Sequence, residues 1–164
     1  MREFESLAKF AEHLAIMSVA VVAAEHKALK RCAKLVEATA KSEIGTYQDA
    51  VGPFPAWPAL AESTEDQKEK SGYPLNSPLL RTGEMRDSIE HEVSGNEAVI
   101  GSKSDIAAYQ EFGTDKIPPR PFIGPAAFRN KEKIRRIIGE ATVEGLTVGA
   151  VIHPSLGYDM EIKP

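Results

Sequence analysis

Residues 3–41 contain neither glycine nor proline, and this stretch constrains the fold more than any other feature of the sequence. Alanine, leucine, lysine and glutamate dominate it, and all four favour helices. Apolar residues recur along it at the three-four spacing of one helix face. We therefore expect one long helix, and a helix broken near residues 25–27 is the alternative. The stripe comprises Phe4, Leu7, Phe10, Ala11, Leu14, Met17, Ser18 and Val21, and then Leu29, Cys32, Leu35 and Val36.

A helix of this length reaches beyond the core of a small domain. It would extend roughly 55 Å at about 1.5 Å per residue. Part of it must then project, bend or pack on a neighbouring subunit. We accordingly expect Phe4 and Phe10 to contribute to an interface with another chain.

Charge and cysteine content narrow the class of protein. The net charge of -4 and the pI near 5.6 give no overall nucleic-acid signature. The single cysteine, Cys32, lies on the apolar stripe and is expected to be a buried, inert thiol. The charged first residues are not those of a signal peptide. The longest apolar run, residues 15–24, is shorter than the roughly 20 residues of a membrane span. We expect no membrane contact and a cytoplasmic start.

Residues 42–78 are rich in proline and glycine and read as a flexible insertion. Within them, residues 59–70 could form a polar helix or stay mobile. Trp57 stands between two prolines, where it could anchor a partner or clasp the domain's own core. Phe54 and Trp57 are therefore candidate interface residues.

Residues 79–146 read as a compact α+β core. Thr82 is expected to cap a short helix that ends at Ser88. Alternating residues 89–93 and 97–101, joined by a Ser-Gly-Asn turn, predict a β-hairpin and thus a small antiparallel sheet.

A second short helix should follow the hairpin, capped by Ser104 or Asp105. Ala108, Tyr109 and Phe112 are expected on one of its faces, and Gly113 at a left-handed helix end.

Residues 116–125 are forced into extended geometry by their prolines. Pro125 is then placed to start a last helix over residues 126–146, packed on the sheet. Residues 147–164 read as an edge strand and tail, and residues 1–164 as a single domain. The residues of the last helix available for the core are Phe128, Ile134, Ile137, Ile138, Ala141 and Leu146.

Searches for catalytic and metal-binding patterns give nothing specific. Three Glu-His pairs occur, but none extends to the HExxH spacing that brings two imidazoles to one ion. No phosphate-binding GxxxxGK[ST] loop and no GxSxG elbow occurs. We expect no catalytic, metal-binding or cofactor-binding residues. Arg129, Lys133 and Arg136 share one face of the last helix, which is solvated, meets an acidic partner or touches phosphates.

Three motifs occur in a fixed order. They are LLRTGEMRDSI from Leu79, AAYQEFGT from Ala107 and PPRPFIGPA from Pro118. In this order and spacing the chain resembles tailed-bacteriophage neck and tail-completion (head-tail joining) proteins, including the Mu-like virion-morphogenesis family. The resemblance covers the middle of the chain. The residues that carry it are Thr82, Gly83, Ser88, Tyr109, Phe112, Gly113, Thr114, Pro121 and Phe122.

The resemblance implies a structural virion protein without enzymatic activity or cofactor. It implies a subunit that joins the head connector to the tail, often as a homo-oligomeric ring, with a hexamer as a candidate size. The implied partners are connector, neck and tail proteins, with transient proximity to DNA. Phe122 is expected in the core, and Arg120 is expected to bond carbonyls or a carboxylate within or across subunits.

Two other classes of function stay open. One is a small cytoplasmic enzyme with an unrecognised site, in which His91 and Glu111 would act as the reactive pair. The other is a nucleic-acid-binding module that uses the basic face of the last helix.

Overall fold

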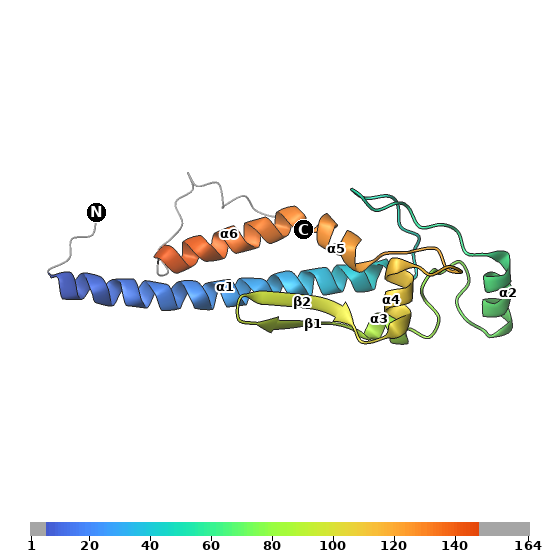
Figure 1. Cartoon of the computed structure of the whole chain (residues 1–164), viewed down its shortest axis with the longest axis horizontal. Helices are drawn as coiled ribbons and strands as arrows, with labels where there is room; N and C mark the ends of the chain where they lie inside the picture. The colour runs from blue at the N-terminus through green and yellow to red at the C-terminus, as the bar shows by residue number, and fades with distance from the viewer. Residues whose placement is uncertain (1–5, 148–164) are drawn as a thin grey trace. The chain divides into compact units, whose positions relative to one another are not determined.

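The computed structural model describes residues 6–147 and has the expected α+β class (Figure 1). Its two strands pair as one antiparallel hairpin, and helices precede and follow it. Phe4 and the edge strand predicted within 147–164 lie outside the described residues, apart from Thr147, which is helical. The elements in chain order are α1 (Leu7–Glu43), α2 (Glu62–Lys70), α3 (Glu84–Asp87), β1 (Ile89–Ser94), β2 (Glu97–Ser102), α4 (Asp105–Phe112), α5 (Ile123–Arg129) and α6 (Lys131–Thr147).

The chain divides into two compact units. The first unit contains the described parts of Met1–Cys32, Val93–Glu97 and Glu132–Pro164, and the second contains Ala33–Glu92 and Ala98–Lys131. The single-domain organisation therefore stays a prediction.

Helix α1 is one unbroken helix of 37 residues, so the alternative of a break near residues 25–27 is wrong. It stops two residues before Gly45, whose φ of 98° is one that glycine adopts without the strain of a side chain. The backbone N–H of Gly45 donates to the carbonyl of Pro78 over 2.9 Å, which joins the end of α1 to the start of the first motif.

The exposure of α1 differs from what the apolar runs alone indicate. The helix contains an 18-residue window with a mean hydropathy of 1.6, and none of that window is buried. By length and composition, α1 could therefore cross a membrane. The expectation of no membrane span rests on the shorter apolar run over residues 15–24, and this longer window does not support it.

The second unit buries a core between the end of α1 and the motif residues. Ala33, Val36 and Ala40 repeat at helical spacing on α1 and are at most 4% exposed. Ile89 on β1 and Phe122 are fully buried, so the core position expected for Phe122 is confirmed. The predicted hairpin is confirmed as well, and Ser88 and Ser102 join its two ends by a hydroxyl contact of 2.7 Å.

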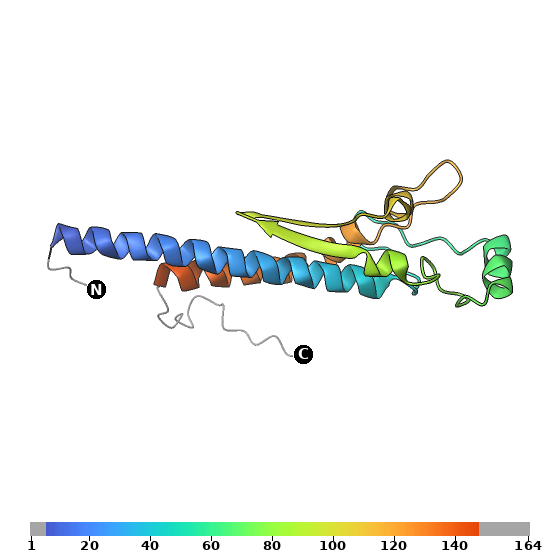
Figure 2. The ribbon, with the colours of Figure 1, turned by 90° about the horizontal axis from the view of Figure 1, so that it is seen from below.

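In the first unit α6 lies along α1 (Figures 1 and 2). Its buried residues Ile137, Ala141 and Gly145 repeat every four positions and form a stripe of small and branched residues. A Cβ atom on Gly145 would lie 2.5 Å from the Cα atom of Val21, so the two backbones nearly touch there. We expect the last helix to pack on the sheet, but this close contact is with α1.

The last helix does not run over 126–146 as one piece. Helix α5 begins at Ile123, three residues earlier than expected, and α6 begins at Lys131. Between them, the side-chain amide of Asn130 donates to the carbonyl of Ala126 over 2.8 Å. Pro125 is thus the third residue of a short helix and not the start of a long one. Of the expected core residues, Ile137 and Ala141 are buried, whereas Phe128, Ile138 and Leu146 are exposed by 39–51%.

Helix α4 turns a face to the core that does not carry its large apolar side chains. Tyr109 is 51% exposed and Phe112 is 81% exposed, whereas Ala107 is buried. Ala108, Tyr109 and Phe112, which the sequence places on one face of this helix, are all exposed. The physical reason lies in Glu111, whose carboxylate faces inward and binds three backbone amides.

Two predicted caps are also corrected. Gly83, with φ of 92°, is the N-cap of α3, and the Thr82 hydroxyl makes only a long 3.4 Å contact with the N–H of Glu84. Gly113 does need a positive φ, which is 76°. Its ψ of 176° places it in the extended glycine region, however, and not in the left-handed helical region.

Candidate functional site

Glu111 connects two of the three motifs. Its Oε2 atom accepts the N–H of Phe122 over 2.7 Å and that of Ile123 over 3.0 Å, and its Oε1 atom accepts the N–H of Gly124 over 3.0 Å. The first N–H groups of a helix have no partner inside the helix and attract negative charge. Glu111 therefore fixes where α5 begins, which explains why AAYQEFGT and PPRPFIGPA occur together.

The turn after α4 prepares the chain for this cap. The Thr114 hydroxyl accepts the N–H of Ile117 over 3.1 Å, and the carbonyl of Ile117 accepts the N–H of Thr114 over 2.9 Å. A Cβ atom on Gly113 would lie 3.0 Å from backbone atoms of Ile117 and Pro119. Only glycine fits this turn without displacement of its neighbours.

Trp57 and Arg120 bind the proline-rich segment to the third motif. The indole Nε1–H of Trp57 donates to the carbonyl of Pro121 over 2.9 Å, and the side chain is 6% exposed. Arg120 is 5% exposed, and its Nη2 atom donates to the carbonyls of Pro58 and Ala59 over 3.0 and 3.1 Å. Trp57 and Arg120 could each have contacted a partner or their own chain. In the structure both contact their own chain.

Phe54 continues this contact towards α5. Its ring meets the Phe128 ring edge to face, with centroids 6.4 Å apart. A Cβ atom on Gly124 would lie 2.7 Å from the Phe54 ring, so the glycine makes room for it. Phe54 is thus partly covered by its own chain, and its role in an interface stays a prediction.

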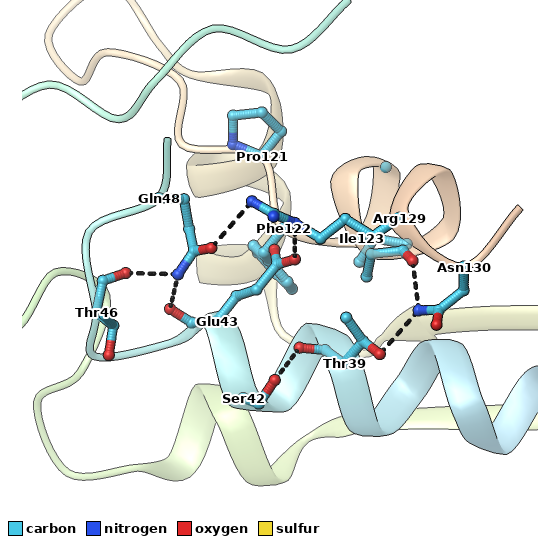
Figure 3. A network of polar contacts seen from close by, with 12 residues as sticks. Thr39, Ser42, Glu43, Thr46, Gln48, Pro121, Phe122, Ile123, Arg129 and Asn130 are labelled. Carbon is cyan, nitrogen blue, oxygen red and sulfur yellow. Dashed lines mark hydrogen bonds and ion pairs between the residues drawn. The ribbon is translucent and has the colours of Figure 1, made fainter. Parts of the chain in front are cut away.

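A polar network surrounds the end of α1 and the end of α5 (Figure 3). Arg129 contacts the Oε1 atom of Glu43 at 3.2 Å and donates from Nη2 to the amide oxygen of Gln48 over 3.3 Å. The Gln48 amide in turn donates to the carbonyls of Glu43 and Thr46. At the other end of the network, Asn130 donates to the Thr39 hydroxyl over 2.8 Å.

Glu43 is the buried charge of this network. Its side chain is 5% exposed, and neither carboxylate oxygen has a well-aligned hydrogen bond. Burial raises the pKa of Glu43 to about 7, against the opposing attraction of Arg129, and the charge of Glu111 raises it further. A carboxyl group with this pKa is about half protonated near neutral pH.

His91 lies in a second polar cluster. Its Nδ1 atom contacts the Oε2 atom of Glu37, and Lys41 donates to Oε1 of the same carboxylate over 2.5 Å. The hydrogen bond from Lys41, followed by that from His91, lowers the pKa of Glu37. His91 is therefore engaged with Glu37, whereas Glu111 is engaged with backbone amides, so the two side chains have separate partners among the described residues.

The described residues 6–147 give no support to a metal or thiol site. Within them, no group of three or more His, Cys, Asp or Glu side chains could hold an ion. Cys32 is buried, and burial raises the pKa of its thiol, which disfavours the reactive thiolate.

The basic face of the last helix is divided by the break at Asn130. Arg129 belongs to α5 and is paired with Glu43, whereas Lys133 and Arg136 belong to α6. The continuous stripe expected for phosphate contact is therefore interrupted.

Exposed apolar side chains are the other feature of interest. Ile106, Tyr109 and Phe112 repeat every three residues on α4 and are 51–81% exposed. On α1, Phe10 is 39% exposed, and Leu7, Leu14 and Val19 are 46–82% exposed. Sequence reasoning singled out α1 as an interface but not α4, because it treated Tyr109 and Phe112 as motif residues and did not predict their exposure.

These features define an α+β subunit whose motif residues build its own framework and whose apolar helix faces point to solvent. Mu-like prophage FluMu G protein 2 of Haemophilus influenzae is 32% identical to the chain over 109 residues, which span 55% of this chain and 71% of that protein. The chain therefore belongs to the Mu-like prophage G protein family of phage morphogenesis proteins. The resemblance inferred from the motifs is thus confirmed. No family model matches the chain, and no solved structure matches it.

Proposed function

We propose that this chain is a structural subunit that joins or completes the tail at the head-tail interface of a phage or prophage particle. It acts without catalysis or a cofactor, by binding copies of itself and connector and tail proteins. The observation that carries the proposal is the relationship to a Mu-like prophage G protein. The two residues that an enzyme hypothesis would use, His91 and Glu111, are both committed to structural contacts, which supports it further.

The hydrogen bonds between the motifs suit a subunit that must keep its shape during particle assembly. A buried hydrogen bond joins Trp57 to Pro121, and a partly buried one joins Glu111 to Phe122. The apolar residues of α4, by contrast, face solvent. We assign the α4 patch, defined as Ile106, Tyr109 and Phe112, to contact with a connector or tail protein, since exposed apolar patches mark interaction sites.

The proposal is tested by deleting the gene and examining the particles by electron microscopy. The expected result is full heads and separate tails that do not join, with joining restored when the chain is supplied from a plasmid. Normal, infectious particles without the chain would overturn the proposal. Purified virions should also contain the chain, at the neck or tail, and its absence from them would contradict the location.

A further inference from the structure

The solvent-exposed side of α1 between residues 27 and 38 carries positive charge and no negative charge. Five residues of this stretch are exposed, and four of them are lysine or arginine. At about 100° per residue, these four fall within roughly 100° of one another around the helix axis. They form one continuous surface, which we call the basic face and which comprises Lys27, Lys30, Arg31 and Lys34.

The buried residues of the same stretch lie on the other side of α1. Ala28, Cys32 and Val36 repeat every four positions and are at most 6% exposed. Their common direction lies roughly 150° from that of the basic face around the helix axis. This part of α1 therefore turns its apolar residues towards its own chain and the basic face towards solvent.

The spacing of the four cations is unfavourable for an isolated helix. Lys27 lies four residues before Arg31, and Lys30 lies four residues before Lys34. Residues at this spacing are neighbours on the helix surface, and like charges there destabilise the helix. The basic face thus keeps a repulsion that a carboxylate at any one of these positions would reduce.

Other cations of α1 are paired with carboxylates. Lys9 contacts Glu12 at 3.0 Å, and Lys41 contacts Glu37 at 2.5 Å. Glu37, the carboxylate that lies among residues 27–38, is 18% exposed and is also bound by His91. Among the ion pairs of residues 6–147, none includes a residue of the basic face. An anionic ligand would therefore relieve a repulsion that these residues leave in place.

The composition of the basic face favours phosphate groups over a protein surface as that ligand. Protein interfaces have aromatic or other apolar anchors at their centre and are depleted in lysine. The fifth exposed residue of the stretch is Ala38, which offers no such anchor. Lysine and arginine, by contrast, are common donors to the phosphate oxygens of DNA.

The stretch also lacks the side chains that read or stack on bases. Residues 27–38 contain no asparagine or glutamine, which bind adenine edges, and no aromatic residue. Proteins that bind single strands use aromatic side chains as stacking platforms. These residue types therefore favour a duplex, contacted through its backbone.

We propose that the basic face of α1 binds the phosphate backbone of double-stranded DNA without regard to sequence. The face extends about 10 Å along the helix axis, a length over which one DNA strand presents about three phosphates. The site differs from the basic residues of the last helix, where Arg129 is paired with Glu43. The inference adds a nucleic-acid contact to the proposed head-tail role and does not depend on it.

The contact should be weak, because the whole chain has a net charge of -4 and only the basic face attracts DNA. Non-specific DNA binding commonly has a Kd of about 1–100 µM at physiological salt. Each neutralised phosphate releases a counterion, so log K falls with log salt by about 0.9 per contact. Four contacts therefore predict a slope of about -3.6.

The test measures the fluorescence anisotropy of a labelled DNA duplex of mixed sequence as the purified full chain is added, over a series of salt concentrations. In the double variant Lys30→Gln/Arg31→Gln, the slope should fall to about -1.8, and binding at low salt should weaken by at least about tenfold. The single variant Arg31→Lys keeps the charge and should bind like the wild type.

The matched control is Lys131→Gln/Lys133→Gln, which removes the same charge from exposed positions at the start of α6. It should leave the slope close to that of the wild type. Equal losses in the two double variants would show that net charge alone governs binding, and would overturn the assignment to α1. A wild type that does not bind the duplex at low salt would overturn the proposal outright.

Thermal unfolding separates a DNA contact from a contact within the chain. Glutamine has nearly the helix propensity of lysine and arginine, and Lys30→Gln/Arg31→Gln removes like-charge repulsion. The melting temperature of this variant should therefore equal or slightly exceed that of the wild type. A clear fall would show that the basic face stabilises the fold through its own chain, and the inference would fail.

An acidic protein surface is the other ligand that the charge alone would allow. Poly-glutamate at the same concentration of charges should compete less well than unlabelled duplex, because its charges are spaced about twice as far apart. Competition as strong as that of DNA would assign the basic face to an acidic protein and overturn the proposal. The deletion test of head-tail joining is independent, since either result there is compatible with binding or no binding of DNA in solution.

Discussion

The Oε2 atom of Glu111 lies 2.7 Å from the backbone nitrogen of Phe122, at the point where the third motif turns into α5. The same carboxylate binds the next two amides, so a single side chain satisfies three N–H groups at the start of the helix. Hydrogen bonds to a charged group are about twice as strong as neutral ones. The motif pair is therefore held by one carboxylate and not by apolar packing alone.

Replacing Glu111 by Gln should destabilise the protein by about 2–3 kcal/mol, because one oxygen becomes an NH₂ group that faces backbone donors. Urea unfolding of the variant measures this. Glu132→Gln on exposed α6 is the matched control and should change stability by less than about 0.5 kcal/mol. Equal effects of the two substitutions would contradict the capping role.

Glu111→Gln should also change the pKa of the Glu43 carboxyl. The charge of Glu111 contributes to the raised pKa of the Glu43 carboxyl. Its removal in Glu111→Gln should therefore move that pKa below about 7, which carbon-13 NMR of the labelled carboxyl would detect. An unchanged Glu43 titration would show that the two groups do not interact.

Glu43 should make stability fall as pH rises. Its folded-state pKa of about 7 lies above the ordinary value of 4.5, so between these pH values the folded state holds a proton that the unfolded state has lost. The stabilising effect is full below about pH 4.5, declines towards pH 7 and is absent above it. One pKa unit corresponds to about 1.4 kcal/mol, so the change should approach 3 kcal/mol.

The check is the difference between the wild type and Glu43→Gln. The variant keeps the side-chain shape but cannot ionise, so the difference between their unfolding free energies should vary between pH 5 and pH 8. Groups such as Glu37, whose pKa is lowered, affect both proteins equally and cancel in this difference. A difference that does not depend on pH would show that Glu43 titrates normally.

Trp57→Phe should cost about 1–2 kcal/mol, because the carbonyl of Pro121 loses its buried donor. Arg120→Lys should cost a similar amount, since an ammonium group does not reproduce the planar donor set that reaches Pro58 and Ala59. Both variants should increase proteolysis of the segment around residues 57–59. Arg135→Lys, which changes an exposed arginine, is the control and should have no effect.

The helix-forming and hairpin signals were local, and the sequence alone was therefore sufficient to predict α1 and the hairpin. The 37-residue helix follows from a run without glycine or proline, and the hairpin follows from alternation around a turn. The orientation of α4 could not be predicted in this way. It depends on a carboxylate at position 111 that binds amides eleven to thirteen residues later, and apolar periodicity contains no sign of it.

The break at Asn130 and the buried Glu43 were missed for the same reason. Asn130 interrupts a helical pattern because its amide finds both the Ala126 carbonyl and the Thr39 hydroxyl, which lies 91 residues away in sequence. Glu43 follows Lys41 and Ser42 on the sequence and reads as a solvated residue. Only the structure shows that the Glu43 side chain is buried and lies 3.2 Å from Arg129.

Substitutions of Phe112 and Phe122 compare an exposed phenylalanine on α4 with a buried one. Phe122 was expected in the core and is fully buried, whereas Phe112 is 81% exposed. Phe122→Ala should cost about 3–5 kcal/mol, the usual loss for a buried phenylalanine. Phe112→Ser should leave the unfolding free energy within about 0.5 kcal/mol of the wild type, because it removes exposed surface only.

The functional readout then distinguishes a surface residue from a contact residue. If the α4 patch binds a connector or tail protein, Phe112→Ser should reduce head-tail joining in the plasmid rescue, although the variant folds normally. Val99→Ser, which changes another exposed apolar residue on β2, should rescue as well as the wild type. Full rescue by Phe112→Ser would remove α4 from the partner interface, and a large loss of stability would show that Phe112 packs in the core after all.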